Sequence, residues 1–500
     1  MARVLRWLMP LLFCFCTQSF LQRQTQGDPP STATHSSDAW FQQKLDHFSK
    51  KRSRFWQQRY YMNDAFYKRG GPVFLMTGGP VAANIDWISQ KYTWMVYAER
   101  LGALCFFLEH RFYGQSQPTG DLSTSSLQYL SSRQALADIA YFRTKIAKEM
   151  GLSKNKWVTF GGFYGGSLAV WSRIKHPKLF AAAVGSSAPI KAKLDFYEYF
   201  ETIHRTLKKH KRMCSVGVKK ALTVIVKMLK TPQNYSKLED DFKLCKPLKI
   251  SSVMDRTFFL DALIKMVAYV VQNNGDNKLI KVEQNGITID GFCDVMTNRS
   301  LGSSYYRYAK FENMMLKNRN QTCLCGNYND YLEVMVDSSL RKQNLKEGIM
   351  LLGKNGNFPF GIEKKRQWLY QCCTEFGFFQ TMDLKNKHNS NLPLRYFIKQ
   401  CSDVFGLDFK VNSLARAVSY TNEYYGGFNV NGSKIILPNG STDPWHVLGI
   451  TKKIHKKFRA VFIKGGTHMA DMFVQTDFDS TELLQAREKI FQILKKWLKL

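Results

Sequence analysis

Acidic residues are scarce in this chain. It has 39 Asp and Glu against 72 Lys and Arg, which gives a formal net charge of +33 and a pI of about 9.7. Basic runs lie at residues 208–212, 452–457 and 495–496. Such a surface is either simply solvated or attracts acidic partners, among them sulfated glycans, anionic lipids and acidic peptides. No nucleic-acid-binding motif accompanies the charge, so we expect no nucleic acid partner.

Long apolar runs are also missing, apart from one at the start. Arg3 and Arg6 precede an apolar stretch that ends in small and polar residues, which is the pattern of a secretory signal peptide over residues 1–19. The next most apolar stretch, residues 254–271, is interrupted by charges and indicates a buried helix rather than a membrane span. We therefore expect no transmembrane segment, and a mature chain that is secreted or held in the lysosomal or endosomal lumen.

Cysteine is almost absent from the first half of the mature chain. Only Cys105 precedes a group of eight between residues 214 and 401, which predicts a disulfide framework of open connectivity in that region. Cys323 and Cys325 lack the spacing of a zinc site, so no metal and no cofactor is predicted. Glycosylation sequons lie at Asn234, Asn298, Asn320 and Asn431, and Asn439 also matches, beside a candidate active-site loop.

Strand-like and helix-like segments alternate in the first part of the chain. Apolar strands are expected at residues 72–77, 103–109, 157–162 and 181–185, and again at 434–438 and 460–464. Between residues 192 and 418 the pattern is helical, with basic faces and most of the cysteines. The alternation predicts an α/β fold with a mostly parallel sheet, formed by residues 20–191 and 419–500 and split by a helical insertion, residues 192–418.

One stretch has the layout of a nucleophile elbow. Residues 157–168 read as an apolar strand, a knot of glycines and the start of a helix, which is how G-x-S-x-G places a serine at the top of an α/β-hydrolase sheet. The position that should carry the nucleophile is Phe163. Ser167 lies one helical turn further on, where we expect it to face the sheet rather than the cleft.

Two later loops supply the partners that such a nucleophile would need. Asp443 follows the strand at residues 434–438, and His468 follows the strand at residues 460–464. The chain order of nucleophile, acid and histidine is that of an α/β-hydrolase. Each residue alone is more simply a turn aspartate or an isolated histidine, but together they predict a pair in which Asp443 orients His468 as general base and acid.

An oxyanion hole can be formed without a serine side chain. The backbone N–H of Tyr164, directly after the elbow position, is one candidate donor. The second would come from the early glycine loop at Gly78 and Gly79.

Several long motifs resemble one known family, that of lysosomal Pro-Xaa carboxypeptidase and dipeptidyl-peptidase II, which are serine exopeptidases. The resemblance covers nearly the whole mature chain. The motifs lie at residues 43–48, 58–60, 108–116, 129–132, 186–189, 373–377, 424–427, 443–446 and 497–500.

The resemblance implies an α/β-hydrolase domain with a disulfide-bonded helical cap over the active site. It also implies peptide-bond hydrolysis at peptide ends, often beside proline, and peptides with free termini as partners. Glu375, in a segment that resembles the lining of the cleft, is implied as a substrate contact. The chain departs from the family at Phe163, where the family has serine, and at Met469, where it has cysteine.

Three interpretations of Phe163 remain open at this point. The protein is a degenerate member that keeps the fold and the cleft without acyl transfer, and binds peptides or polyanions. Alternatively, it is an active serine peptidase in which Phe163 is an allele or a sequence error, because Ser and Phe codons can differ by one base. As a third possibility, it is a secreted basic binding protein that does not use the cleft.

Overall fold

The computed structural model describes most of the mature chain. The described residues are 38–51, 53–249, 252–274, 287–340, 366–382, 391–406, 409–452 and 458–499. The predicted signal peptide lies outside them.

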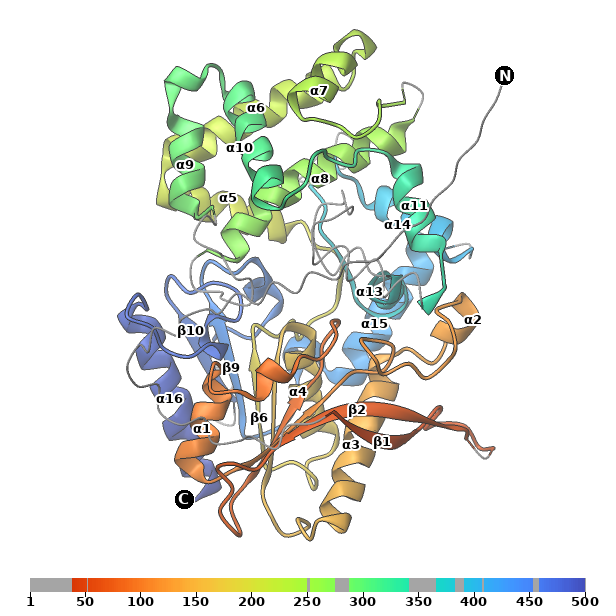
Figure 1. Cartoon of the computed structure of the whole chain (residues 1–500), viewed down its shortest axis with the longest axis vertical. Helices are drawn as coiled ribbons and strands as arrows, with labels where there is room; N and C mark the ends of the chain where they lie inside the picture. Colours follow the sequence, from red (N-terminus) through yellow and green to blue (C-terminus); the bar gives the residue numbers. More distant parts are fainter. Residues whose placement is uncertain are drawn as a thin grey trace, which may run out of the picture. The chain divides into compact units, whose positions relative to one another are not determined.

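An eight-stranded sheet forms the centre of the fold (Figure 1). Its order is β1-β2-β4-β3-β5-β6-β9-β10. The pairings of β1 with β2 and of β2 with β4 are antiparallel, and the remaining pairings are parallel. The strands are β1 (Ala39–Lys44), β2 (Phe55–Asn63), β3 (Val73–Thr77), β4 (Leu104–Leu108), β5 (Trp157–Gly162), β6 (Ala182–Ser186), β9 (Ile435–Gly440) and β10 (Phe458–Ile463). This is the α/β-hydrolase arrangement that the sequence predicted.

Alternate residues of the central strands supply two separate cores. Val73 and Leu75 of β3 belong to one core, which also holds the apolar faces of α3 (Ser132–Glu149) and α4 (Phe163–Lys175). Phe74 and Met76 belong to the other, together with α1 (Thr93–Leu101) and the C-terminal helix α16 (Thr481–Leu498). Strands covered on both faces need apolar residues at every position, which explains their continuous apolar sequences.

A helical cap separates β6 from β9 in the sequence, although the two strands pair in the sheet. Its longer helices are α5 (Glu198–His210), α6 (Arg212–Met228), α8 (Val253–Gln272), α9 (Ile289–Thr297), α10 (Ser304–Asn318), α11 (Tyr328–Val336), α14 (Leu394–Phe405) and α15 (Val411–Tyr425). Disulfides join Cys214 to Cys293, Cys245 to Cys323 and Cys373 to Cys401. The disulfide-bonded helical cap was therefore predicted correctly.

A short two-stranded sheet in the insertion was not predicted from the sequence. The strands β7 (Lys193–Asp195) and β8 (Gly377–Phe379) pair in parallel. β8 follows directly on a π-helical turn, Cys372–Phe376, which continues from α13 (Arg366–Gln371). This pairing ties the start of the insertion to the segment that faces the elbow.

Several of the family motifs form a buried polar network beneath the sheet edge. The Arg111 guanidinium donates to both carboxylate oxygens of Asp138 at 2.6 Å, and His47 reaches the same carboxylate at 2.8 Å. Glu109, fully buried, accepts from Arg59 at 2.7 Å and from Ser116. These residues hold β2, the loop after β4 and α3 together.

Among the described residues, no helix is both long and apolar enough to cross a membrane. The same residues contain no group of three or more His, Cys, Asp or Glu side chains placed to hold a metal ion. Of the sequons, Asn298, Asn320 and Asn431 are exposed and Asn234 is partly exposed, whereas Asn439 is buried in β9.

Candidate active site

Phe163 occupies the tip of the turn between β5 and α4. Its φ is +53°, a left-handed conformation that is strained for a bulky residue. The turn is possible because Gly161 has no side chain: a Cβ there would lie 2.3 Å from the carbonyl oxygen of Gly165. Strained backbone of this kind costs on the order of 1–3 kcal/mol and is typical of the residue that carries the nucleophile.

The Phe163 side chain is packed among three other rings. Its centroid lies 4.6 Å from that of Trp445, 5.5 Å from that of His468 and 5.6 Å from that of Trp368. Only 6% of the residue is exposed. The ring therefore fills the space immediately in front of the candidate catalytic histidine.

Asp443 and His468 lie together, as their spacing predicted. Oδ2 of the fully buried Asp443 is 3.0 Å from Nδ1 of His468. This separation places the carboxylate and the imidazole at ion-pair distance. The other carboxylate oxygen accepts from the backbone N–H of Trp445 at 2.9 Å, which fixes the carboxylate at the start of its loop.

Gln272, at the end of α8, connects the cap to both of these loops. Its backbone carbonyl accepts from the N–H of His468 at 3.1 Å. Its side-chain oxygen accepts from Trp445 Nε1 at 3.0 Å and from the hydroxyl of Tyr199 at 2.9 Å. Sequence reasoning missed this residue, because one glutamine at the end of an apolar helix carries no signal of its partners.

A cavity of about 270 Å³ opens in front of Phe163 and His468. The hydrolase domain contributes these two residues and Trp445, while the cap contributes residues of α5, α8, α11, α13 and α14. Most of the lining is aromatic, with Asp261 and Lys265 of α8 as its charged members. A largely apolar cavity with a few polar groups suits a small ligand or the end of a longer chain.

The oxyanion-hole donors are placed partly as expected. Tyr164 is the second residue of α4, so its backbone N–H has no partner within the helix. Gly79 lies against the same helix, with its Cβ position 3.5 Å from the nitrogen of Gly165. Gly78 differs from the expectation, because its N–H already donates to the carbonyl of Leu108 at 2.9 Å. The geometry therefore favours Tyr164 and Gly79.

The Tyr164 side chain is fixed by a directed set of hydrogen bonds. His110 Nδ1 lies 2.7 Å from the carbonyl of Arg111 and must carry the proton there, which leaves Nε2 to accept from the Tyr164 hydroxyl at 3.0 Å. Gln371 donates to the same hydroxyl oxygen at 3.0 Å. Burial lowers the pKa of His110 to about 4, so its ring stays neutral.

Glu375 does not line this cavity, contrary to its predicted role as a substrate contact. Its carboxylate accepts from the backbone N–H of Ser132 at 2.9 Å and from the Ser132 hydroxyl at 2.8 Å, at the N-terminus of α3. Burial raises the pKa of Glu375 to about 7, and the bonds from Ser132 and Gln371 partly oppose this shift. The observed partners make Glu375 a link between cap and hydrolase domain.

Ser167 is turned away from the cavity. Its hydroxyl donates to the carbonyl of Pro189 at 2.9 Å, and the residue is buried. It therefore offers no substitute nucleophile at the elbow.

Comparison with known proteins adds sequence relationships to this geometry. The sequence profile of the serine carboxypeptidase S28 family matches residues 43–490. The thymus-specific serine protease of Homo sapiens is 34% identical over 501 residues, covering 97% of this chain and 91% of that protein. The human lysosomal Pro-X carboxypeptidase is 28% identical over 486 residues, covering 94% and 90%. Among solved structures, a proline iminopeptidase of Mycobacterium smegmatis aligns over 92% of this chain and 98% of that one, with a TM-score of 0.38 at 8% identity.

Proposed function

Because the chain belongs to the serine carboxypeptidase S28 family, we propose that it is a member whose nucleophile position is occupied by Phe163. In this proposal the covered cavity binds the ends of peptides without cleaving them. The observation that carries the proposal is the conformation of Phe163. Its backbone has the strained φ of an elbow residue, while its ring packs against His468 and has no nucleophilic atom.

The chemical cost of this substitution is large. Acyl transfer by a serine peptidase requires a hydroxyl that His468 can deprotonate, and removing such a serine costs on the order of 10⁶ in kcat in a measured protease. The Phe163 ring also takes up the space beside His468 where the carbonyl of a scissile bond would have to approach. Both effects favour an impaired enzyme.

The retained groups support the view that a single residue separates this site from activity. With serine at position 163, its hydroxyl would attack the substrate carbonyl and pass its proton to His468. Asp443 would hold the imidazole in the required tautomer. The N–H groups of Tyr164 and Gly79 would stabilise the negative charge on the carbonyl oxygen.

We further propose that the protein is a glycoprotein of the secretory or lysosomal lumen. The three disulfides of the cap favour an oxidising compartment. The exposed sequons at Asn298, Asn320 and Asn431 are accessible to glycosylation. A relative named as a lysosomal carboxypeptidase is in keeping with this location.

A fluorophosphonate probe, which labels activated serines covalently, tests the nucleophile. We expect no labelling of the unaltered protein and labelling of Phe163→Ser. Phe163→Ala, which opens the same space without a hydroxyl, and the double variant Phe163→Ser with His468→Ala are the matched controls and should stay unlabelled. Labelling of the unaltered protein, or hydrolysis of a proline-containing peptide that is lost in His468→Ala, would instead show an active enzyme.

Peptide binding is tested separately by titration calorimetry with a proline-containing pentapeptide. We expect Trp368→Ala, in the cavity wall, to weaken binding at least about tenfold. Trp40→Ala, on the exposed face of β1, should leave binding unchanged. Equal effects of the two variants would favour a basic binding protein that does not use its cleft.

A further inference from the structure

A second cavity, of about 610 Å³, lies within the cap. It runs between α5 and α6 and across α8, and among the described residues it shares no lining residue with the cavity in front of Phe163. Its volume falls in the ordinary range for small-molecule sites, roughly 300–1,000 Å³. Neither the proposed peptide binding nor the fold itself accounts for it.

The floor and walls of this groove are apolar. Leu260, Ile264 and Val267 of α8 form a buried floor. The wall from α5 includes the buried Ile203 and Leu207, while the apolar wall residues of α6 are only partly buried. On α6 the wall residues are Val218, Leu222 and Val226, spaced four apart on one face. Eight residues of helix extend about 12 Å, so this stripe is long and narrow.

The mouth of the groove is positively charged. Arg205 and Lys219 are exposed lining residues with no ion pair to any described residue, and Glu201 is the one acidic residue among the described lining. His204, also on the rim, has a lowered pKa because of its burial and the nearby charges of Lys208 and Lys219. The two helices that form the walls carry seven Lys and Arg against two Glu.

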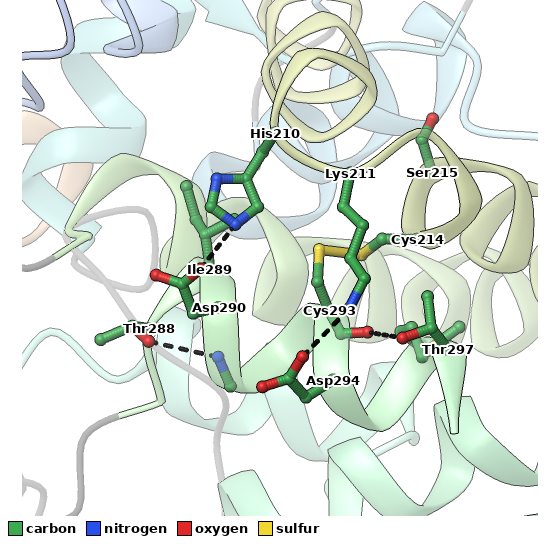
Figure 2. The surroundings of a disulfide bond; sticks show 12 residues. His210, Lys211, Cys214, Ser215, Thr288, Ile289, Asp290, Cys293, Asp294 and Thr297 are labelled. Carbon is green, nitrogen blue, oxygen red and sulfur yellow. Dashed lines mark hydrogen bonds and ion pairs between the residues drawn. A yellow bond between two sulfur atoms is a disulfide. The ribbon is translucent and has the colours of Figure 1, made fainter.

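Two basic residues at the turn between α5 and α6 are paired with acidic residues of α9 (Figure 2). His210 lies 2.8 Å from Asp290, and Lys211 donates to Asp294 at 3.1 Å. Both acids belong to α9, which the Cys214–Cys293 disulfide joins to α6. Arg205 and Lys219, which line the groove, are not part of these pairs with α9.

We propose that this groove binds a medium-chain fatty acid such as dodecanoate. The alkyl chain lies along the stripe of Val218, Leu222 and Val226, and the carboxylate lies at the mouth with Arg205 and Lys219. A sulfated glycan would satisfy the charge but leave the apolar walls in water. A neutral lipid would fill the walls but leave the cationic mouth unmatched, so an anionic single-chain amphiphile fits both features.

Titration calorimetry of the full chain with dodecanoate tests the charged end. We expect saturable binding that Lys219→Glu with Arg205→Glu weakens at least about tenfold. The matched control is Lys220→Glu, which changes the next residue of α6 outside the groove lining and should leave affinity within about twofold. Dodecanol should bind at least about tenfold more weakly than dodecanoate.

The apolar end is tested by filling the groove. Leu222→Trp should abolish dodecanoate binding, whereas Val224→Trp, on the exposed face of the same helix, should not. Shortening the ligand to octanoate should weaken binding about fourfold per methylene, on the order of 10² in all. Thermal unfolding verifies that each variant is folded.

Three results would overturn the proposal. One is the absence of saturable dodecanoate binding, including the case in which only a sulfated oligosaccharide binds. The second is an equal loss in the double variant, Lys219→Glu with Arg205→Glu, and in Lys220→Glu, which would assign binding to the general basic surface. The third is dodecanoate binding that Leu222→Trp leaves intact. None of these measurements depends on position 163, so they are independent of the proposed peptide function.

Discussion

The backbone N–H of His468 donates to the carbonyl of Gln272, the last residue of α8, over 3.1 Å. A helix of the cap thus holds the loop that carries the candidate catalytic histidine. Since the side chain of Gln272 also accepts from Trp445, the same residue anchors the loop after Asp443. The cap is therefore a part of the site and not only a cover over it.

We expect Gln272→Leu to lower the free energy of unfolding by about 2 kcal/mol, because it removes the partly buried oxygen that accepts from Trp445 and Tyr199. Urea denaturation measures this loss. Gln272→Glu keeps an acceptor oxygen and should lose less. In the Phe163→Ser background, Gln272→Leu should also slow labelling by the fluorophosphonate probe. Identical behaviour of the two variants would contradict this role.

Replacing Phe163 should reveal its backbone strain. Loss of the buried ring in Phe163→Ala should cost about 3 kcal/mol. Glycine normally makes a helix less stable than alanine does. At φ +53°, however, glycine avoids the steric penalty of a Cβ, so Phe163→Gly should be more stable than Phe163→Ala by about 1 kcal/mol. Denaturant titration of the two variants measures which is more stable. A more stable Phe163→Ala would argue against strain at the elbow.

Glu375 should make the protein more stable in acid than at neutral pH. Although the residue as a whole is only partly buried, its carboxylate is enclosed, and its folded-state pKa of about 7 lies above the ordinary value of 4.5. The folded state thus binds this proton more tightly than the unfolded state does. Protonated Glu375 therefore makes its whole contribution to the free energy of unfolding below pH 4.5, and this contribution is lost as pH rises to 7.

The measurement for Glu375 compares unfolding free energies at pH 5 and pH 7.5. We expect the wild type to lose on the order of 2 kcal/mol more than Glu375→Gln over this interval, because the amide does not titrate. Other buried carboxyl groups with a raised pKa also make the protein less stable as pH rises, and subtracting the change seen in the variant removes their contribution. Asp471 is one of them, because burial raises its pKa to about 6. An equal change in the unfolding free energy of the two proteins between pH 5 and pH 7.5 would refute the expectation.

Asp138→Asn should be strongly destabilising, by about 3–5 kcal/mol, because it leaves the fully buried guanidinium of Arg111 without its counter-charge. Glu488→Gln is the matched control. It breaks the exposed pair with Arg100 and should cost less than about 1 kcal/mol. Thermal or urea unfolding of both variants tests the contrast, and similar losses would mean that burial does not govern these pairs.

The sequence predicted the sheet and the Asp443–His468 pair because both depend on local patterns. The run Val73–Thr77 is apolar up to Met76 and is bounded by Pro72 and Gly78, which is typical of a short strand covered on both faces. Loops after parallel strands meet at one edge of the sheet. The three-residue strands β7 and β8 were missed, because their pairing depends on partners nearly two hundred residues apart.

Roles that depend on long-range contacts were not predictable in the same way. Gly78 was expected to donate to an oxyanion, but it lies one residue too early and pairs with Leu108 instead. Glu375 was placed in the cleft from its segment, yet its carboxylate points to the N-terminus of α3. In both cases the direction of the group is set by a neighbour distant in sequence.

The pairing of β6 with β9 also has a consequence for biosynthesis. About 250 residues separate the end of β6 from the start of β9, so the ribosome needs roughly 10–50 s after making one strand to deliver the other. During that time β6 presents an unpaired, apolar edge, which is a template for association with other chains. The nascent hydrolase domain is therefore most exposed to chaperones while the cap is being translated, and neither Asp443 nor His468 exists until that interval has ended.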